Sequence, residues 1–220
     1  MAAVLSGHLT KLQAVNDILW SIGELPVNSL ESGLGDAEIA EAQIDRLSRE
    51  IQMRGWQVNT KYAHTLTKNA SNQFTLPENT LRVDTSHRRS SRQTSSPVYS
   101  SHLNAHMKRS ADDTLWLMYD GDNNSETWST LTEMTVDLVQ LLPFASLTPA
   151  LQHFIWTAAA HRFQKGAMGS RVLTQYTAEM VFNAEAQAVQ EDSMNEDLNI
   201  IRDNPHVRSV AYRNNPGFNR

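Results

Sequence analysis

The residues with the clearest potential for chemistry lie in the middle of the chain. His102 and His106 are four residues apart, a spacing that brings two imidazoles to one zinc ion when it falls on a helix. The segment around them is rich in serine, and no motif places an acidic third ligand beside them. We therefore expect no metal at this pair. We expect His153 and His161, which are eight residues apart, to be packed or surface residues.

A second candidate site is the stretch DGDNNSETWSTL, which starts at Asp120 like a calcium-binding loop. Asp120, Asp122 and Asn124 stand where such a loop places its first ligands. Its sixth residue is Ser125 instead of glycine, and its twelfth is Leu131 instead of glutamate. Since those positions provide the sharp turn and the bidentate ligand, the stretch does not predict a calcium site. Asp-Gly after an apolar strand instead predicts a hairpin turn.

A third set has the residue types of an acyl-transfer triad: Asp84, Ser86 and His87. Adjacent positions on a strand point to opposite faces, so their closeness in sequence argues against a triad. The chain has no G-x-S-x-G motif, no Gly-Lys-Ser/Thr phosphate loop and no cysteine. The missing cysteines exclude disulfides, thiolate metal sites and cysteine nucleophiles. We therefore expect neither an acyl-transfer site nor a phosphate-binding loop.

Charge is distributed unevenly along a chain whose net charge is -5. Between Arg82 and Arg109 six basic residues accompany a single acidic one, whereas between Glu185 and Asp203 six acidic residues accompany a single basic one. Such separation indicates either surfaces that meet charged partners or two solvated segments. The basic residues Arg88, Arg89 and Arg92 have the chemistry to hold phosphates, or to dock on an acidic neighbour.

Helical periodicity is confined to the two ends of the chain. Apolar residues at spacings of three and four predict a helix from about Thr10 to Ile22, with Thr10 as the N-cap and Gly23 as the stop. A second helix should open at Asp36 and end near Gly55, which stands where a C-cap glycine belongs.

The third helix should begin at Thr148-Pro149, an N-cap followed by the preferred first helical residue, and break at Gly166 and Gly169. Ser170 can cap a fourth helix over residues 171–195. The acidic end of that helix opposes the helix dipole, so we expect fraying or docking there. Its apolar face is predicted to comprise Val172, Leu173, Tyr176, Met180, Val181, Ala184 and Ala188.

Short strand-like pieces replace the helical period between the two halves. They fall at Gln57–Thr60, Gln73–Leu76, Leu81–Asp84, Leu115–Tyr119 and Val136–Gln140. The predicted fold class is α+β, a bundle of about four helices with a β-rich insertion between them. The expected domains are a helical core (1–56 and 143–199), a β-rich insertion (57–142) with a mobile Ser/Arg loop at about 86–110, and a C-terminal tail (200–220). No apolar run approaches the roughly 20 residues of a membrane span.

Four blocks of the sequence, taken together with their order and spacing, indicate a relationship to a known family. They read AVNDILWSIGELPVNSLES, REIQMRGW, LPENTLRVD and VDLVQLLPFASLTPALQHFIWTAAAHRFQKGAMGS. In this order and with these gaps, the chain resembles the tail tubular protein A family, the head-to-tail adaptors of short-tailed bacteriophages. The resemblance covers nearly the whole chain, from about Leu12 to Arg202.

The resemblance implies a structural virion protein at the head–tail junction, assembled in the host cytoplasm. It implies a homo-oligomer, a ring of twelve copies, between the portal protein and the tail nozzle protein. Double-stranded DNA would pass through its lumen without sequence recognition, and neither a cofactor nor a catalytic residue is implied. On this basis we expect protein interfaces in the Ser/Arg loop and in the tail, at Arg88, Arg89, Arg92, Arg202, Arg208, Arg213 and Phe218.

Two readings from other classes stay open. A tail-associated polysaccharide or peptidoglycan hydrolase would require a convergent pair of carboxylates. A nucleic-acid-binding protein would use the Ser/Arg loop, but that loop lacks interleaved aromatic residues and the chain is acidic overall.

Overall fold

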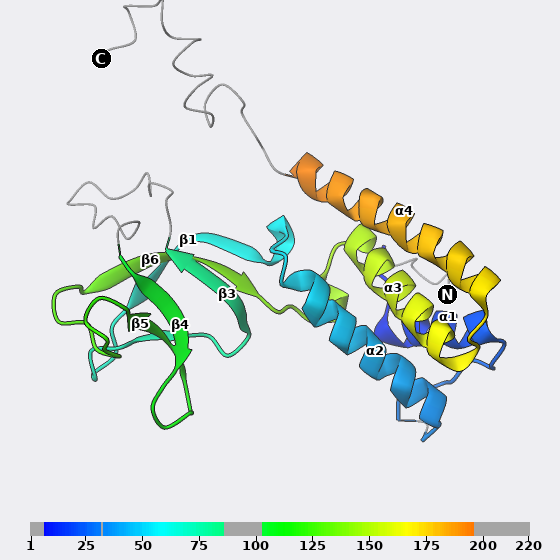
Figure 1. Cartoon of the computed structure of the whole chain (residues 1–220), viewed down its shortest axis with the longest axis horizontal. Coiled ribbons are helices and arrows are strands. Elements are labelled where there is room, and N and C mark those ends of the chain that lie inside the picture. The colour runs from blue at the N-terminus through cyan, green and yellow to red at the C-terminus, as the bar shows by residue number, and fades with distance from the viewer. Residues whose placement is uncertain (1–6, 32, 86–102, 196–220) are drawn as a thin grey trace, which may run out of the picture.

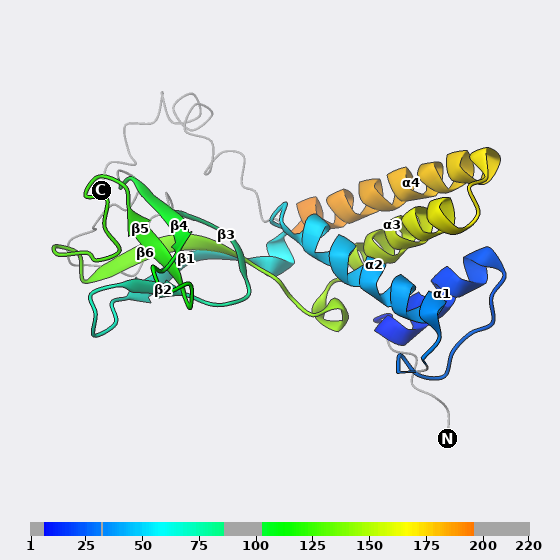
Figure 2. The same cartoon turned by 60° about the horizontal axis from the view of Figure 1, so that its bottom comes forward.

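The computed structural model describes residues 7–31, 33–85 and 103–195 and confirms the α+β class (Figure 1). Within these residues lie four α-helices and six β-strands. The helices gather at one end of the molecule and the strands at the other, so that the chain forms an elongated body with two parts (Figures 1 and 2).

Helix α1 (Lys11–Ile22) begins and ends at the predicted residues. The Oγ1 atom of Thr10 accepts a hydrogen bond from the Gln13 amide at 3.2 Å, and the Gln13 side chain accepts one from the Thr10 amide at 2.9 Å. This reciprocal capping box satisfies two amides that the helix start leaves unpaired. Gly23, at φ 87°, then ends the helix in the left-handed region that favours glycine.

Helices α2 (Gly35–Gln52) and α3 (Pro149–Ala167) follow their predicted signals with small shifts. The Thr148 hydroxyl caps α3 by accepting from the Leu151 amide, and Pro149 is the first helical residue, as predicted. α2 starts one residue before Asp36 and has no side-chain cap. The predicted break at Gly166 is wrong, because one glycine near the end of a helix lowers its stability by only about 1 kcal/mol.

The bundle core forms where α1 and α2 pack against α3. Ile18, Ile44, Leu151 and Ile155 are fully buried there, one or two from each helix. Burial of each such side chain contributes roughly 1.5–3 kcal/mol. One buried amide, that of Gln152, ties the core to neighbouring backbone by donating to the Phe144 carbonyl at 2.8 Å and accepting from the Leu9 amide at 2.9 Å.

The strands form two three-stranded antiparallel sheets. The first has the order β1 (Thr60–Thr67), β6 (Glu133–Gln140), β3 (Thr80–Thr85), and the second β2 (Phe74–Leu76), β5 (Trp116–Asp120), β4 (Ala105–Arg109). Their inner faces share a second hydrophobic core around Phe74, Met118 and Trp128. The Trp128 indole donates to the Met118 carbonyl at 2.8 Å, so this large side chain is buried with its polar atom satisfied.

Two strand predictions need correction. The predicted strand Gln57–Thr60 is a 3₁₀ turn, η1 (Gln57–Asn59), because the Asn59 side chain accepts a hydrogen bond from the Trp56 amide and closes the turn locally. Strand β4 occupies the end of the range 86–110 that was expected to be loop. Ala105 and Met107 pack against the sheet core. The Arg109 guanidinium lies 5.0 Å from the centre of the Trp116 ring, a packing that an apolar pattern does not reveal.

A buried polar cluster joins the two parts of the molecule. Gln52, at the end of α2, is 0% exposed. Its amide nitrogen donates to the Leu142 carbonyl at 3.0 Å, and its amide oxygen accepts from the Leu142 backbone amide at 2.8 Å. Asn59 donates to the carbonyls of Gln52 and Gln140, each at 3.0 Å. The end of α2, the turn η1 and the chain leaving β6 are therefore held in one arrangement.

Candidate assembly surface

Helix α4 (Arg171–Asn195) is the longest helix and the least covered by the rest of the chain. Of its 25 residues only Ala184 and Ala188 are buried. Val172 is 78% exposed, Tyr176 64% and Phe182 70%. The apolar face predicted for this helix is therefore only partly correct: Ala184 and Ala188 contact the core, whereas Val172, Tyr176 and Met180 are exposed to solvent.

The position of α4 explains this exposure. It runs back along α3 on the outside of the bundle, so that α3 lies between α4 and the helices α1 and α2 (Figures 1 and 2). The two alanines allow close approach to α3, and the ring nitrogen Nδ1 of His161 shares a hydrogen bond with the Thr177 hydroxyl at 2.8 Å. Among the α-helices, α3 therefore provides the main packing surface for α4, and much of the outward side of α4 is left exposed.

Polar contacts fasten the far end of α4. Asp192 accepts a hydrogen bond from the Gln57 amide at 2.8 Å, and Glu191 accepts one from the Ala150 amide at 3.2 Å. Glu185 forms an ion pair with Arg54. Glu191 thereby places a negative charge at the positive end of α3, which is favourable. Of the two outcomes expected for this acidic end, fraying or docking, the structure shows docking.

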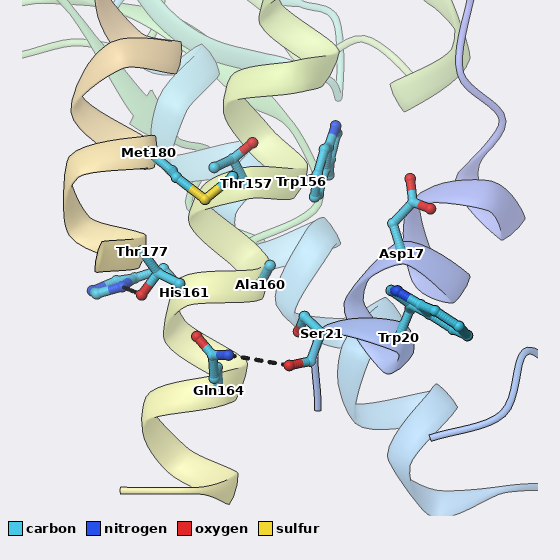
Figure 3. A pocket seen from close by; sticks show the side chains of 10 residues that line it. All are labelled: Asp17, Trp20, Ser21, Trp156, Thr157, Ala160, His161, Gln164, Thr177 and Met180. Carbon is cyan, nitrogen blue, oxygen red and sulfur yellow. Dashed lines mark hydrogen bonds between the residues drawn. The ribbon is translucent and has the colours of Figure 1, made fainter. Parts of the chain in front are cut away.

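A cavity of about 380 Å³, here called the α1–α4 groove, opens between α1 and α4 above α3 (Figure 3). Trp20 comes from α1, Met180 and Thr177 from α4, and α3 provides the floor with Trp156, Thr157, Ala160, His161 and Gln164. Trp20 is 75% exposed although it lines this cavity. The groove is therefore an apolar concavity whose aromatic wall faces solvent.

The polar groups in the α1–α4 groove are either paired with the protein or shifted toward neutrality. The Gln164 amide donates to the Ser21 carbonyl at 3.1 Å (Figure 3). Burial raises the pKa of Asp17, and burial together with the nearby Lys165 lowers the pKa of His161. Both shifts favour the neutral form of the group. Such a lining suits an apolar partner surface better than it suits acid–base chemistry.

Two carboxylates on α2 are engaged in a structural contact with α1. Glu41 and Asp45 lie on one face of α2, and the Lys11 ammonium bridges them at 2.8 Å to each carboxylate. Burial lowers the pKa of Lys11, but hydrogen bonds to the two carboxylates outweigh it and raise the pKa overall. Both carboxylates therefore take part in a salt bridge that ties α1 to α2.

The calcium-like stretch is a turn after β5. The Asp120 carboxylate accepts from the amides of Asp122 and Asn123 at 3.0 and 3.1 Å and from the Asn123 side chain at 2.7 Å. Burial opposes its ionisation, but these hydrogen bonds hold the pKa of Asp120 below its usual range. Asp120 also pairs with Ser125 across the turn, as the hairpin prediction requires. The carboxylate is therefore used to close the turn.

The interface residues expected from the sequence, namely Arg88, Arg89, Arg92, Arg202, Arg208, Arg213 and Phe218, lie outside the described residues. Ser86, His87 and His102 do so as well, whereas His106 lies on β4 with its ring 5.2 Å from that of Tyr119. In residues 7–31, 33–85 and 103–195 no group of three or more histidine or acidic side chains is arranged to hold a metal ion. No helix formed by these residues is long and apolar enough to span a membrane.

Sequence reasoning missed the α1–α4 groove and the buried junction cluster. The groove joins Asp17 and Trp20 to residues more than a hundred positions away. One signal was available: five tryptophans are more than a core of this size needs, and tryptophan is enriched at protein interfaces.

A family model of the tail tubular proteins matches residues 12–198 of the chain. No curated protein matches it.

Proposed function

Because the chain belongs to the tail tubular protein family, whose members are structural components of the bacteriophage tail, we propose that it is a head-to-tail adaptor. In this proposal, copies of the chain form a ring between the portal protein and the tail nozzle protein. The ring has twelve copies, as the sequence resemblance implies, and forms part of the channel through which genomic DNA is ejected.

The observation that carries the proposal is the uncovered state of α4. Large exposed apolar patches on a soluble protein mark surfaces that bind a partner. The exposed apolar surface here comprises Trp20 on α1 and, on different sides of α4, Tyr176, Phe182 and Val189. Leaving it in water costs free energy that burial against another copy would recover, at about 25 cal/mol per Å².

The shape of the molecule also suits a ring subunit. The helical bundle and the β-sheets lie end to end, so neighbouring copies can stand side by side along the long axis (Figure 2). A closed ring needs a heterologous interface, in which one surface of a copy meets a different surface of the next. The chain offers different surfaces on the two flanks of α4.

The proposed channel agrees with the charge of the chain. At a net charge of -5, a ring of such subunits carries a strongly negative field. Like charge on DNA and on its conduit prevents the phosphate contacts that hold DNA on basic proteins. DNA would therefore slide through without being bound or read.

Assembly of the purified full-length chain tests the proposal. Negative-stain images should show rings, and light scattering should give a mass several times that of the 24.7 kDa chain. Particles of monomer mass only, at concentrations well above micromolar, would contradict the proposed ring.

We also propose that Arg88, Arg89 and Arg92 contact an acidic surface of a neighbouring copy or of the nozzle protein. Reversing all three charges to glutamate should weaken ring assembly or nozzle attachment, most strongly at low salt, where charges are least screened. Assembly and attachment that are both unchanged at low salt would count against this contact.

A further inference from the structure

Helix α4 presents a second exposed apolar surface on the flank opposite the α1–α4 groove. Met180 lines the groove, and Phe182 is two residues further on, about 200° around the helix. Val189 follows Phe182 by seven residues and so lies on the same side. We call this surface the α4 ridge, and its exposed members are Ala178, Phe182, Ala186 and Val189.

The α1–α4 groove has the size and the lining to receive such a ridge. Its volume of about 380 Å³ lies within the roughly 300–1,000 Å³ of cavities that bury sizeable apolar groups. Trp20 and Met180 form its two walls, and Thr157 and Ala160 leave a shallow floor over α3 (Figure 3). An apolar helix side entering a groove with anchors one and two turns apart is a common recognition mode.

We propose that the α4 ridge of one copy packs into the α1–α4 groove of the next copy. This inference rests on the proposed ring and identifies the surfaces that build it. The ridge and the groove lie on opposite flanks of one helix, so each copy can use both at once. Repetition of one contact between two different surfaces generates a ring, whereas a single self-complementary surface would stop at a dimer.

Charges beside the two surfaces complement each other. Lys165 lies close enough to the groove residue His161 to lower its pKa, and Glu179 precedes the ridge residue Phe182 by one helical turn. In the part of the chain that the structure describes, neither Lys165 nor Glu179 forms an ion pair. A second copy therefore meets an apolar centre with an unpaired charge of opposite sign on each side, which favours this occupant over an unrelated apolar segment.

Cross-linking tests the contact directly, because the chain has no cysteine and every introduced thiol is the only one at its site. Asp17→Cys places a thiol in the groove, and Ala186→Cys places one on the ridge. With a short bismaleimide, the double variant of the full-length chain should give a ladder of covalent dimers, trimers and larger species. Each single variant should stay monomeric on a denaturing gel, since one thiol alone cannot bridge two different surfaces.

The double variant Asp17→Cys with Val172→Cys is the matched control, because Val172 lies on α4 but on neither surface; it should give no ladder. Rings in negative stain without a ladder from the ridge–groove pair would overturn this inference and leave the proposed function intact. Dimers from Ala186→Cys alone would show symmetric pairing of α4 and would also overturn it. A wild-type chain that forms no ring would contradict the proposed function itself, and with it the contact.

A second test weakens the contact without cross-linking. Phe182→Asp should raise the concentration needed for ring assembly about tenfold or more, because it puts a charge where an apolar anchor is buried. Val172→Asp changes an equally exposed residue of the same helix and should leave assembly unchanged. Both variants should unfold at the same urea concentration as wild type. If Phe182→Asp assembles like wild type, the ridge does not enter the groove.

Discussion

A few side chains hold the helical bundle and the β-sheets together, and Gln52 is among them. Its side chain satisfies both backbone polar groups of Leu142 and donates to the Ser48 hydroxyl as well. The cluster includes Asn59, which links the same helix end to the last residue of β6. The Gln52 and Asn59 side chains are buried, so the loss of one partner there leaves a polar group unsatisfied at a higher cost than that of a surface hydrogen bond.

We therefore expect Gln52→Leu to lower the free energy of unfolding by about 2–3 kcal/mol, since a fully buried side chain would lose two hydrogen bonds to Leu142 and one to Ser48. Urea denaturation followed by circular dichroism measures this change. Gln190→Leu, on the exposed side of α4, is the matched control and should change stability by about 0.5 kcal/mol or less. Equal effects of the two substitutions would argue that the cluster does not hold the two parts together.

At the same scale, His161 should make the stability of the α3–α4 pair depend on pH. Burial and Lys165 lower its pKa in the folded state, so the unfolded chain binds a proton more readily. The contribution of neutral His161 to the free energy of unfolding is fully present above a pH of about 6.5, the pKa of histidine in the unfolded chain. It is lost as the pH falls through the lower pKa of His161 in the folded state. The stability difference between wild type and His161→Gln in urea should therefore be larger at pH 8 than at pH 5. A difference that stays constant with pH would contradict this linkage.

At the scale of elements, the ends of helices could be predicted because their signals are local. Thr10 with Gly23, and Thr148 with Pro149, act on backbone within a few residues, so sequence spacing alone contains the necessary information. Strand β4 could not be predicted in this way, because its packing partner Trp116 arrives from β5 across a turn. The face of α4 was predicted as one stripe, since periodicity tells which residues share a side but not whether another helix covers that side.

Gly55, between α2 and η1, combines a positive φ with close neighbouring atoms. Its φ of +83° lies in the left-handed region, and a Cβ atom there would lie 2.9 Å from Nη2 of Arg82 and 3.2 Å from Cγ2 of Val139 in the central strand β6. We expect Gly55→Ala to destabilise the chain by about 1 kcal/mol more than Gly23→Ala does. Gly23 is the matched control, because its φ of +87° costs the same backbone strain with no atom within 4 Å. If the two variants unfold at the same temperature, the side chains around Gly55 move aside without a loss of stability.

At the scale of the whole molecule, we expect ring assembly and binding to the portal protein to depend on different parts of the chain. The proposed ridge–groove contact lies entirely within residues 7–195, whereas Arg202, Arg208, Arg213 and Phe218 lie beyond it. We expect a chain that ends after Ile201 to form rings but to lose binding to the portal protein, since these cations and this aromatic side chain are the proposed portal contacts. Negative stain checks the rings, and co-elution with portal protein checks the attachment. If the shortened chain binds the portal protein as well as wild type does, the residues after Ile201 are not the portal contact.

The β-sheet part is connected to the helical part at two neighbouring points of the backbone. The chain runs into it along β1 and returns along β6, and these strands are direct neighbours, with Thr60 paired to Val139. Two adjacent backbone crossings are all that tie the sheets covalently to the helices. A replacement sheet unit of different sequence, or a short loop, could therefore be grafted between these two points while the helical scaffold keeps its own fold. Changes in the sheet part would then leave the proposed contact between helices of neighbouring copies unaffected.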